Sequence, residues 1–127
     1  MKRTVILTVS LVALAALAVA APAVQAKGGP GTRIALKASG SFTGASGKAK
    51  FQNGGQRELE IEVEHVRRLA GKRVNFFVNS TKVGSARVSG LGAAQVNRRG
   101  AGFPAINAGT RIKVKTAGGK LIVSGRF

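Results

Sequence analysis

Polar and apolar residues alternate with a period of two along most of the chain beyond residue 31, and glycine or asparagine separates the alternating runs. This pattern is typical of short β-strands joined by turns, and no window long enough for a helix shows a 3.6-residue period. The pattern predicts eight strands, at residues 32–39, 47–52, 57–66, 72–79, 82–89, 93–98, 110–116 and 120–127.

Eight short strands without a helix predict an all-β fold. The spacing of the turns favours a two-sheet antiparallel β-sandwich of immunoglobulin-like or prealbumin-like shape, and a small β-barrel is the alternative. The chain beyond residue 26 is long enough for one modest core. We therefore expect a flexible leader at residues 27–31 and a single β-sandwich domain at residues 32–127.

The segment at residues 57–66 alternates most strictly, and every acidic residue of the chain lies in it, at Glu58, Glu60, Glu62 and Glu64. Four carboxylates on one strand face repel one another unless neighbouring strands supply cations. A three-residue loop at residues 54–56 sets Lys50 opposite Glu60 and Lys48 opposite Glu62. We interpret the row as a solvated charge ladder. The alternative, a cation site or a catalytic carboxylate pair, normally needs converging loop ligands or an apolar setting.

The same alternation gives three expectations for the neighbouring segments. A turn through residues 69–71 sets Arg73 opposite Glu64 on the other flank of the acidic strand. His65 continues the apolar side of that strand, which indicates a partly buried structural histidine. Phe76 and Phe77 are adjacent and must point to opposite faces. For Phe77, burial between sheets is favoured over a role in stacking on a base or a sugar.

The first 26 residues differ from the rest of the chain. Lys2 and Arg3 precede an uncharged apolar run at residues 5–21, and Pro22 and the small residue Ala26 follow it. This arrangement is typical of a signal peptide at residues 1–26, so we expect export to the periplasm or the extracellular space. A retained membrane anchor is the alternative, because the apolar run lies at the lower limit for spanning a bilayer. After cleavage we expect no transmembrane segment.

Charge narrows the class of partner. The chain holds 21 Lys and Arg against four acidic residues, and two of these cations lie in the first 26 residues, so cleavage leaves 19 and a net charge near +15. Such a charge keeps a small domain soluble and monomeric and attracts polyanions. The expected partners are anionic polymers or lipid head groups, with no specific nucleic acid. The alternative is that the charge serves solubility alone.

Two neighbouring groups of cations are the candidate anion-binding residues. Strict alternation places Arg111, Lys113 and Lys115 on one strand face, while Arg98 and Arg99 precede a glycine pair in the loop at residues 98–109. Glycine allows a phosphate or sulfate to approach the backbone closely. We expect the five cations to form one surface. For the loop itself, the favoured interpretation is a crossover between sheets, pinned by the apolar residues at 103–106, and an anion-binding loop is the alternative.

The chain has no cysteine, one histidine and no recognisable nucleophile or nucleotide-binding motif. We therefore expect no enzyme activity, no catalytic residue, no cofactor and no metal site. The first hypothesis is an exported, non-enzymatic binding module whose strongly basic surface meets anionic envelope or extracellular polymers. The second is a structural or assembly domain that pairs with a partner through its sheet edges.

Five segments also carry a likeness to known proteins, at residues 47–51, 58–66, 77–86, 103–109 and 122–127. Through them, residues 49–127 resemble a loosely defined group of small secreted bacterial all-β domains of unknown function. Such domains usually have Asn-Gly where this chain has Asn79 and Ser80, and many of them are acidic. The segment at 47–51 with the strand after it also has a faint likeness to chordin-type repeat domains. Neither resemblance implies catalytic residues.

Overall fold

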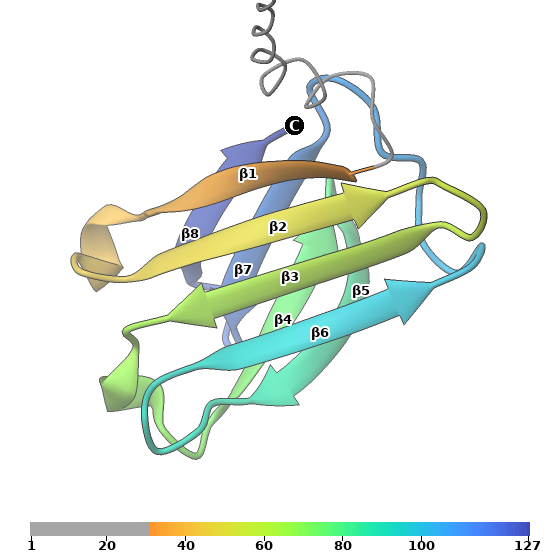
Figure 1. The fold of residues 1–127 in the computed structure, drawn as a ribbon. Helices are drawn as coiled ribbons and strands as arrows, with labels where there is room; N and C mark the ends of the chain where they lie inside the picture. Colours follow the sequence, from red (N-terminus) through yellow and green to blue (C-terminus); the bar gives the residue numbers. More distant parts are fainter. Residues whose placement is uncertain (1–30) are drawn as a thin grey trace, which may run out of the picture.

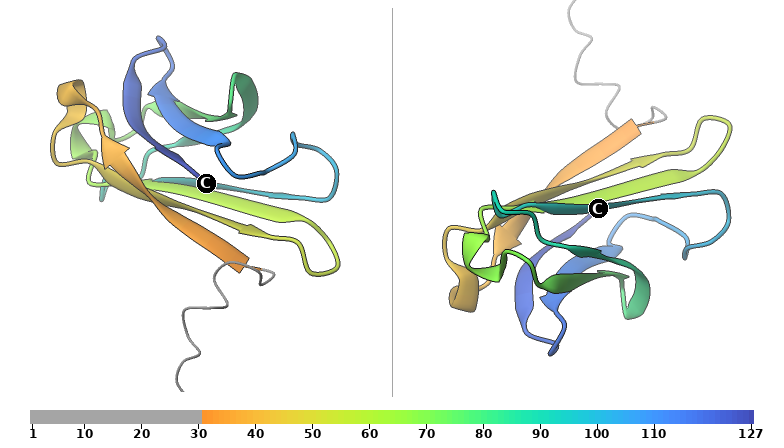
Figure 2. Two further views of the ribbon diagram at one scale, coloured as in Figure 1. Left: turned by 90° about the horizontal axis from the view of Figure 1, so that it is seen from above. Right: turned by 90° about the horizontal axis from the view of Figure 1, so that it is seen from below.

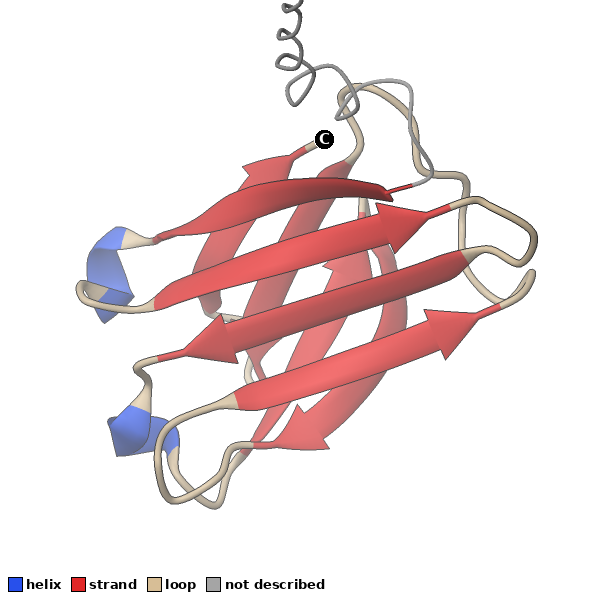
Figure 3. Cartoon of the chain, in the orientation of Figure 1, coloured by secondary structure: helices blue, strands red, loops and turns tan. Residues whose placement is uncertain are grey.

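The computed structural model describes residues 31–127, which form eight antiparallel strands and two short 3-10 helices (Figures 1 and 3). The elements are β1 (Gly31–Ala38), η3 (Gly40–Phe42), β2 (Ser46–Gln52), β3 (Glu58–Glu64), η4 (Arg67–Leu69), β4 (Arg73–Val78), β5 (Thr81–Arg87), β6 (Ala94–Arg99), β7 (Arg111–Thr116) and β8 (Leu121–Arg126). Within these residues, no helix is long and apolar enough to cross a membrane. The predicted signal peptide lies outside the described residues.

All eight strands belong to one sheet with the order β5-β4-β7-β8-β1-β2-β3-β6. The sheet folds into two layers, β1-β2-β3-β6 and β5-β4-β7-β8, which Figure 2 shows edge-on. A ladder of two residue pairs between β1 and β8, Lys37 with Ser124 and Ala38 with Val123, joins the layers. The all-β prediction is confirmed. The two-sheet sandwich is not confirmed, because this ladder makes the layers one nearly closed, barrel-like sheet, which fits the alternative.

Glycines allow the layers to approach at both sides of the barrel. At the β5–β6 side, a Cβ on Gly84 would lie 2.6 Å from Cγ2 of Val96. At the β1–β8 side, a Cβ on Gly125 would lie 2.7 Å from the carbonyl oxygen of Ala35. A side chain at either position therefore requires the strands to move apart, because backbone and branched side chains cannot yield that much.

The alternating residues of both layers fill one core. Leu59, Ile61 and Val63 of β3 are fully buried, and Phe76 of β4 is the largest fully buried side chain opposite them. Most outward residues of the strands are polar, as expected for side chains that face water. The predicted register of β2 and β3 is confirmed, since Lys48 lies opposite Glu62 and Lys50 opposite Glu60. All eight predicted strands are present, with ends shifted by one or two residues in most cases.

The expected pairing of Arg73 with Glu64 is wrong. The second neighbour of β3 is β6, and Arg73 lies opposite Arg87 in the other layer. The chain leaves β3 through His65, whose φ of 64° is left-handed, and η4 then carries it across the end of the barrel. His65 is exposed, so its predicted partial burial is also wrong. Alternation identifies a strand and its faces, but it does not say whether the next strand pairs beside it or lies in the facing layer.

The segment after β6 is the crossover between the layers. Phe103 is buried and meets the Phe51 ring edge-on, with 6.3 Å between the ring centroids. The Arg57 guanidinium lies 4.0 Å from the Phe103 ring centroid and donates hydrogen bonds to the carbonyl oxygens of Gly100, Phe103 and Pro104. Arg57 thus stabilises the loop by stacking and by satisfying its backbone acceptors.

Candidate anion-binding face

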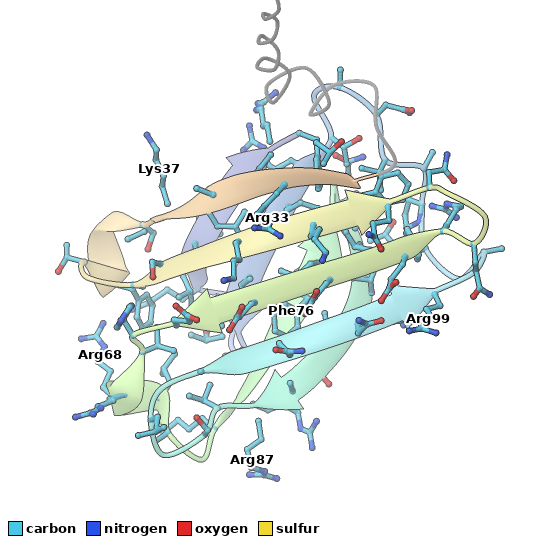
Figure 4. All side chains as sticks on the ribbon, viewed as in Figure 1. Arg33, Lys37, Arg68, Phe76, Arg87 and Arg99 are labelled. Atoms are coloured by element: carbon cyan, nitrogen blue, oxygen red, sulfur yellow. The ribbon has the colours of Figure 1, made fainter. Side chains whose placement is uncertain are left out.

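The glutamate face is the outer surface of β1, β2, β3 and β6. Its charged and amide residues are Arg33, Lys37, Lys48, Lys50, Gln52, Glu58, Glu60, Glu62, Glu64, Gln95, Asn97 and Arg99. All four carboxylates of the chain lie here, in the row between the cations of β2 and the polar residues of β6. Figure 4 labels Arg33, Lys37 and Arg99 on this side of the barrel.

Side chains on the two flanking strands balance the carboxylate row. The Lys48 Nζ and Glu62 Oε1 atoms are 3.6 Å apart, and the Arg99 Nε and Glu58 Oε2 atoms are also 3.6 Å apart. Asn97 donates to Glu58 over 3.0 Å, and Gln95 donates to Glu60 over 3.4 Å. These contacts support the charge-ladder interpretation of the row.

Glu62 has an unusual environment within the row. Burial raises the pKa of its carboxyl, and the hydrogen bond and negative charge of Glu64 raise it further, while Lys48 opposes the change. A hollow of about 200 Å³ lies beside it, lined by Arg33, Lys48, Lys50, Glu60 and Glu62. Because both signs of charge line this hollow, it does not favour a ligand of either sign.

The cationic face is the outer surface of β5, β4, β7 and β8. Val74, Phe76, Ile112 and Val114 point into the core, so the residues between them on β4 and β7 point outward. The cations of this face are Arg73, Lys82, Arg87, Arg111, Lys113, Lys115 and Arg126. None of its residues is acidic.

Two pairs of arginines face each other directly across this sheet. Arg73 lies opposite Arg87, and Arg111 lies opposite Arg126. Like charges in directly opposed positions destabilise a sheet. Hydrogen bonds to uncharged groups hold one pair, since Arg73 donates to Ser85 Oγ over 3.3 Å and Arg87 donates to the Gly71 carbonyl over 2.6 Å. These partners leave the positive charge of the face uncompensated.

Phe77 lies in the middle of the cationic face. Lys113 on β7 and Lys82 on β5 are its partners in register, and the Lys115 Nζ atom lies 5.1 Å from its ring centroid. The favoured prediction of burial between sheets is wrong for Phe77, because Phe76 takes the core position and the next residue must point outward. The half-buried ring gives the face an apolar centre with lysines on both neighbouring strands.

The five predicted anion-binding residues separate between the layers. Arg111, Lys113 and Lys115 share the cationic face, whereas Arg98 and Arg99 belong to β6 in the other layer. Arg98 points inward and donates to the carbonyl oxygens of Val83 and Gly102 at the β5–β6 side of the barrel. Arg99 pairs with Glu58. The structure therefore does not bring the five cations together.

Sequence reasoning missed the four further cations of the cationic face, which are Arg73, Lys82, Arg87 and Arg126. A local signal existed for them, because β5 follows β4 and β8 follows β7 after short turns, which places these residues near Phe77 and near Arg111. The pairing of β4 with β7 has no such signal, since residues 79–110 lie between the two strands in the chain.

Comparison with protein-family models, curated proteins and solved structures finds no match for this chain. The two resemblances noted in the sequence therefore remain predictions. Among residues 31–127, the structure contains no group of three or more His, Cys, Asp and Glu side chains that is arranged to hold a metal ion.

Proposed function

We propose that the protein is an exported, non-enzymatic module that binds anionic polymers through its cationic face. The observation that carries the proposal is the segregation of charge. Seven cations share one face without a carboxylate, while all four glutamates lie on the other face. A surface of one sign concentrates polyanions and increases their rate of association.

The geometry of the face favours a repeating anion. Neighbouring strands lie about 4.8 Å apart, and alternate residues along a strand lie about 6.7 Å apart. The seven cations lie at such spacings over four strands, on the outside of a sheet and not in a concave pocket. A polymer with repeated anionic groups can contact several of them at once, whereas a single small anion cannot. A bound polyanion also relieves the repulsion between the opposed arginines. This relief makes the binding free energy of a polyanion more favourable, and a neutral ligand gains nothing from it.

The proposal is tested by two triple variants of equal composition. Replacing Arg111, Lys113 and Lys115 of β7 with glutamine removes one arginine and two lysines from the cationic face. Replacing Arg33, Lys48 and Lys50 removes the same types from the glutamate face. Affinity for heparin is measured by titration calorimetry between about 50 and 200 mM salt, the range over which polyanion contacts weaken strongly.

The β7 variant is expected to lower the slope of log K against log salt by about two to three, because each lost contact contributes roughly 0.7 to 0.9. The glutamate-face variant is expected to change the affinity less than about threefold. Its cations lie away from the bound polymer, so their attraction for the polymer is weak and is screened by salt. Equal losses from both variants would show that net charge alone matters, and the proposed face would be abandoned.

A second function, assembly through sheet edges, has one supporting observation. Within residues 31–127, β5 pairs only with β4 and β6 pairs only with β3. An added strand would have to displace Arg98 from the Val83 carbonyl and Val96 from Gly84. An inward charge at an edge is a known protection against such pairing. Partner capture that is indifferent to salt would favour this second function over polyanion binding.

Export is a separate part of the proposal, and the composition of residues 1–26 supports it. We expect cleavage after Ala26, so that the protein recovered from the periplasm or medium begins at Lys27. Intact-mass spectrometry of that material measures the result. A mass that retains the first 26 residues contradicts cleavage and favours the membrane anchor.

A further inference from the structure

A concave site of about 220 Å³ lies at the end of the barrel, between η3 and η4. Ser41, Thr43, His65, Arg67 and Arg68 supply its polar lining, and Phe42 and Val66 supply its apolar lining. Figure 4 labels Arg68 at this end. None of these residues belongs to the glutamate face or to the cationic face, and no carboxylate lines the cleft.

Core contacts hold both walls of the cleft in place. Phe42 and Val66 are 7% and 3% exposed, so each wall has an anchor in the core. The Arg68 guanidinium lies 4.5 Å from the Phe42 ring centroid and donates to the Ser41 carbonyl. These contacts connect η4 to η3. They use part of the donor capacity of Arg68 and leave its other N–H groups for a ligand.

The backbone beside Arg67 is also constrained. The Val66 N–H donates to the Gly92 carbonyl over 3.0 Å. Gly92 has a φ of +85°, and a Cβ there would lie 2.6 Å from the Arg67 backbone nitrogen. The turn of η4 therefore packs against a position that only glycine can occupy, because any side chain there would push the Arg67 backbone away. Arg67 itself is exposed and takes part in none of the ion pairs within residues 31–127.

His65 lies at the mouth of the cleft in a conformation that costs free energy. Its φ of 64° is left-handed, which is unfavourable for a residue with a Cβ. Such strain concentrates at functional sites, where the surrounding structure maintains it. The Nδ1 atom is 3.0 Å from Ser46 Oγ, and this contact orients the ring. Within residues 31–127, the Nε2 atom makes no hydrogen bond.

We propose that this cleft binds the terminal group of a phosphate or sulfate monoester. Two guanidinium groups, an imidazole and two hydroxyls surround it, and a tetrahedral anion with three free oxygens accepts hydrogen bonds from several directions at once. A carboxylate has two oxygens in one plane and uses fewer of these donors. At about 220 Å³ the cleft is large enough for a tetrahedral anion together with the first atoms of its carrier.

This proposal is independent of polymer binding at the cationic face, because it rests on other residues and on a concave site. It is tested with inorganic phosphate as the probe, added to the purified protein in place of chloride at constant ionic strength. Amide chemical shifts report the site of binding. We expect saturable shifts at Ser41, Thr43 and Arg67, with a Kd in the millimolar range, and only small linear shifts on β7.

Arg67→Gln is expected to weaken phosphate binding about tenfold, because it removes one charge-assisted contact. Arg67→Lys keeps the charge but loses the planar fork, so it is expected to weaken binding about threefold. Arg33→Gln is the matched control, since Arg33 is also an exposed arginine but belongs to the glutamate face. Unsaturable shifts, or equal weakening by Arg67→Gln and Arg33→Gln, would overturn the proposal. Retention of the amide spectrum shows that each variant is folded.

Two further binding experiments distinguish a soluble monoester from a lipid head group as the ligand of the cleft. Methyl phosphate represents a soluble monoester, and neutral vesicles that contain phosphatidic acid represent a lipid head group. Vesicles with phosphatidylglycerol, a diester, control for surface charge. A specific loss of phosphatidic acid binding in Arg67→Gln assigns the site to lipids. A loss confined to methyl phosphate assigns it to soluble monoesters, and unchanged binding of both ligands contradicts the site.

Discussion

The glutamate face and the cationic face are built from the same alternation of inward apolar and outward polar residues, yet their charges are balanced differently. On the glutamate face, five cations surround four carboxylates, and ion pairs and amide hydrogen bonds connect them. On the cationic face, seven cations have no acidic neighbour, and two arginine pairs oppose each other. The side chains therefore give the cationic face a net charge of +7, from seven cations and no carboxylate, and the glutamate face +1, from five cations and four carboxylates.

This difference separates two uses of surface charge. If the cations served solubility alone, an even distribution of them over the surface would be sufficient. Such a distribution would also avoid repulsion between neighbouring cations. Opposed arginines lower stability, and their concentration on one layer is the physical argument for the binding face proposed above. The glutamate face shows that this chain can place carboxylates beside cations where strand pairing brings them together.

The largest expected effect comes from making the cationic face resemble the glutamate face. Lys113→Glu with Lys115→Glu is expected to weaken heparin binding on the order of 100-fold at about 50 mM salt, because two contacts become repulsive. The same variant is expected to raise the free energy of unfolding by roughly 0.2 to 1 kcal/mol, since it relieves repulsion. Titration calorimetry and urea denaturation measure the two quantities.

The matched control for that variant is Lys48→Glu with Lys50→Glu on the glutamate face. It changes the net charge equally, but it removes the partners of Glu62 and Glu60. We expect lower stability and a much smaller loss of heparin binding. If both variants change binding and stability alike, the two faces do not differ in function.

A second variant breaks the balance of the glutamate face itself. Glu60→Lys with Glu62→Lys places like charges opposite Lys50 and Lys48, so the free energy of unfolding is expected to fall by about 1 to 2 kcal/mol. Adding Lys48→Glu and Lys50→Glu restores opposite charges across the ladder and is expected to recover part of the loss. The midpoint of urea denaturation measures both steps, and no recovery would mean that the pairs contribute nothing.

The smallest expected effect is a pH dependence at Glu62. Because burial and Glu64 raise the pKa of this carboxyl in the folded protein, the folded state holds its proton more tightly than the unfolded chain does. Its contribution to stability is therefore present at low pH and is lost as the pH rises through the raised pKa of this carboxyl in the folded protein. Glu62→Gln is expected to remove this part of the pH dependence of the denaturation midpoint. An identical profile in the variant would contradict the assigned cause.

The sequence determined the strands and one pairing because these depend on local information. Alternation identified all eight strands, and the charges of residues 48–62 selected the register between β2 and β3. A register shifted by one residue would have placed Phe51 beside a glutamate and Lys50 toward the core. Both the packing of the core and the pairing of charges therefore disfavour that register. The placement of Arg111, Lys113 and Lys115 on one outward face follows from the same period of two.

Only the tertiary structure decided which strands lie beside one another across the barrel. The β1–β8 ladder joins two layers that the pattern alone describes as separate sheets, and the close approaches at Gly84 and Gly125 complete the closure. The same closure turned Arg98 inward and separated it from Lys113. Pairing between distant strands depends on how side chains of the whole core fill space, and a period of two in each strand is compatible with several such arrangements. For that physical reason the cationic face, which combines β4 with β7, emerged from the folded chain and not from its sequence.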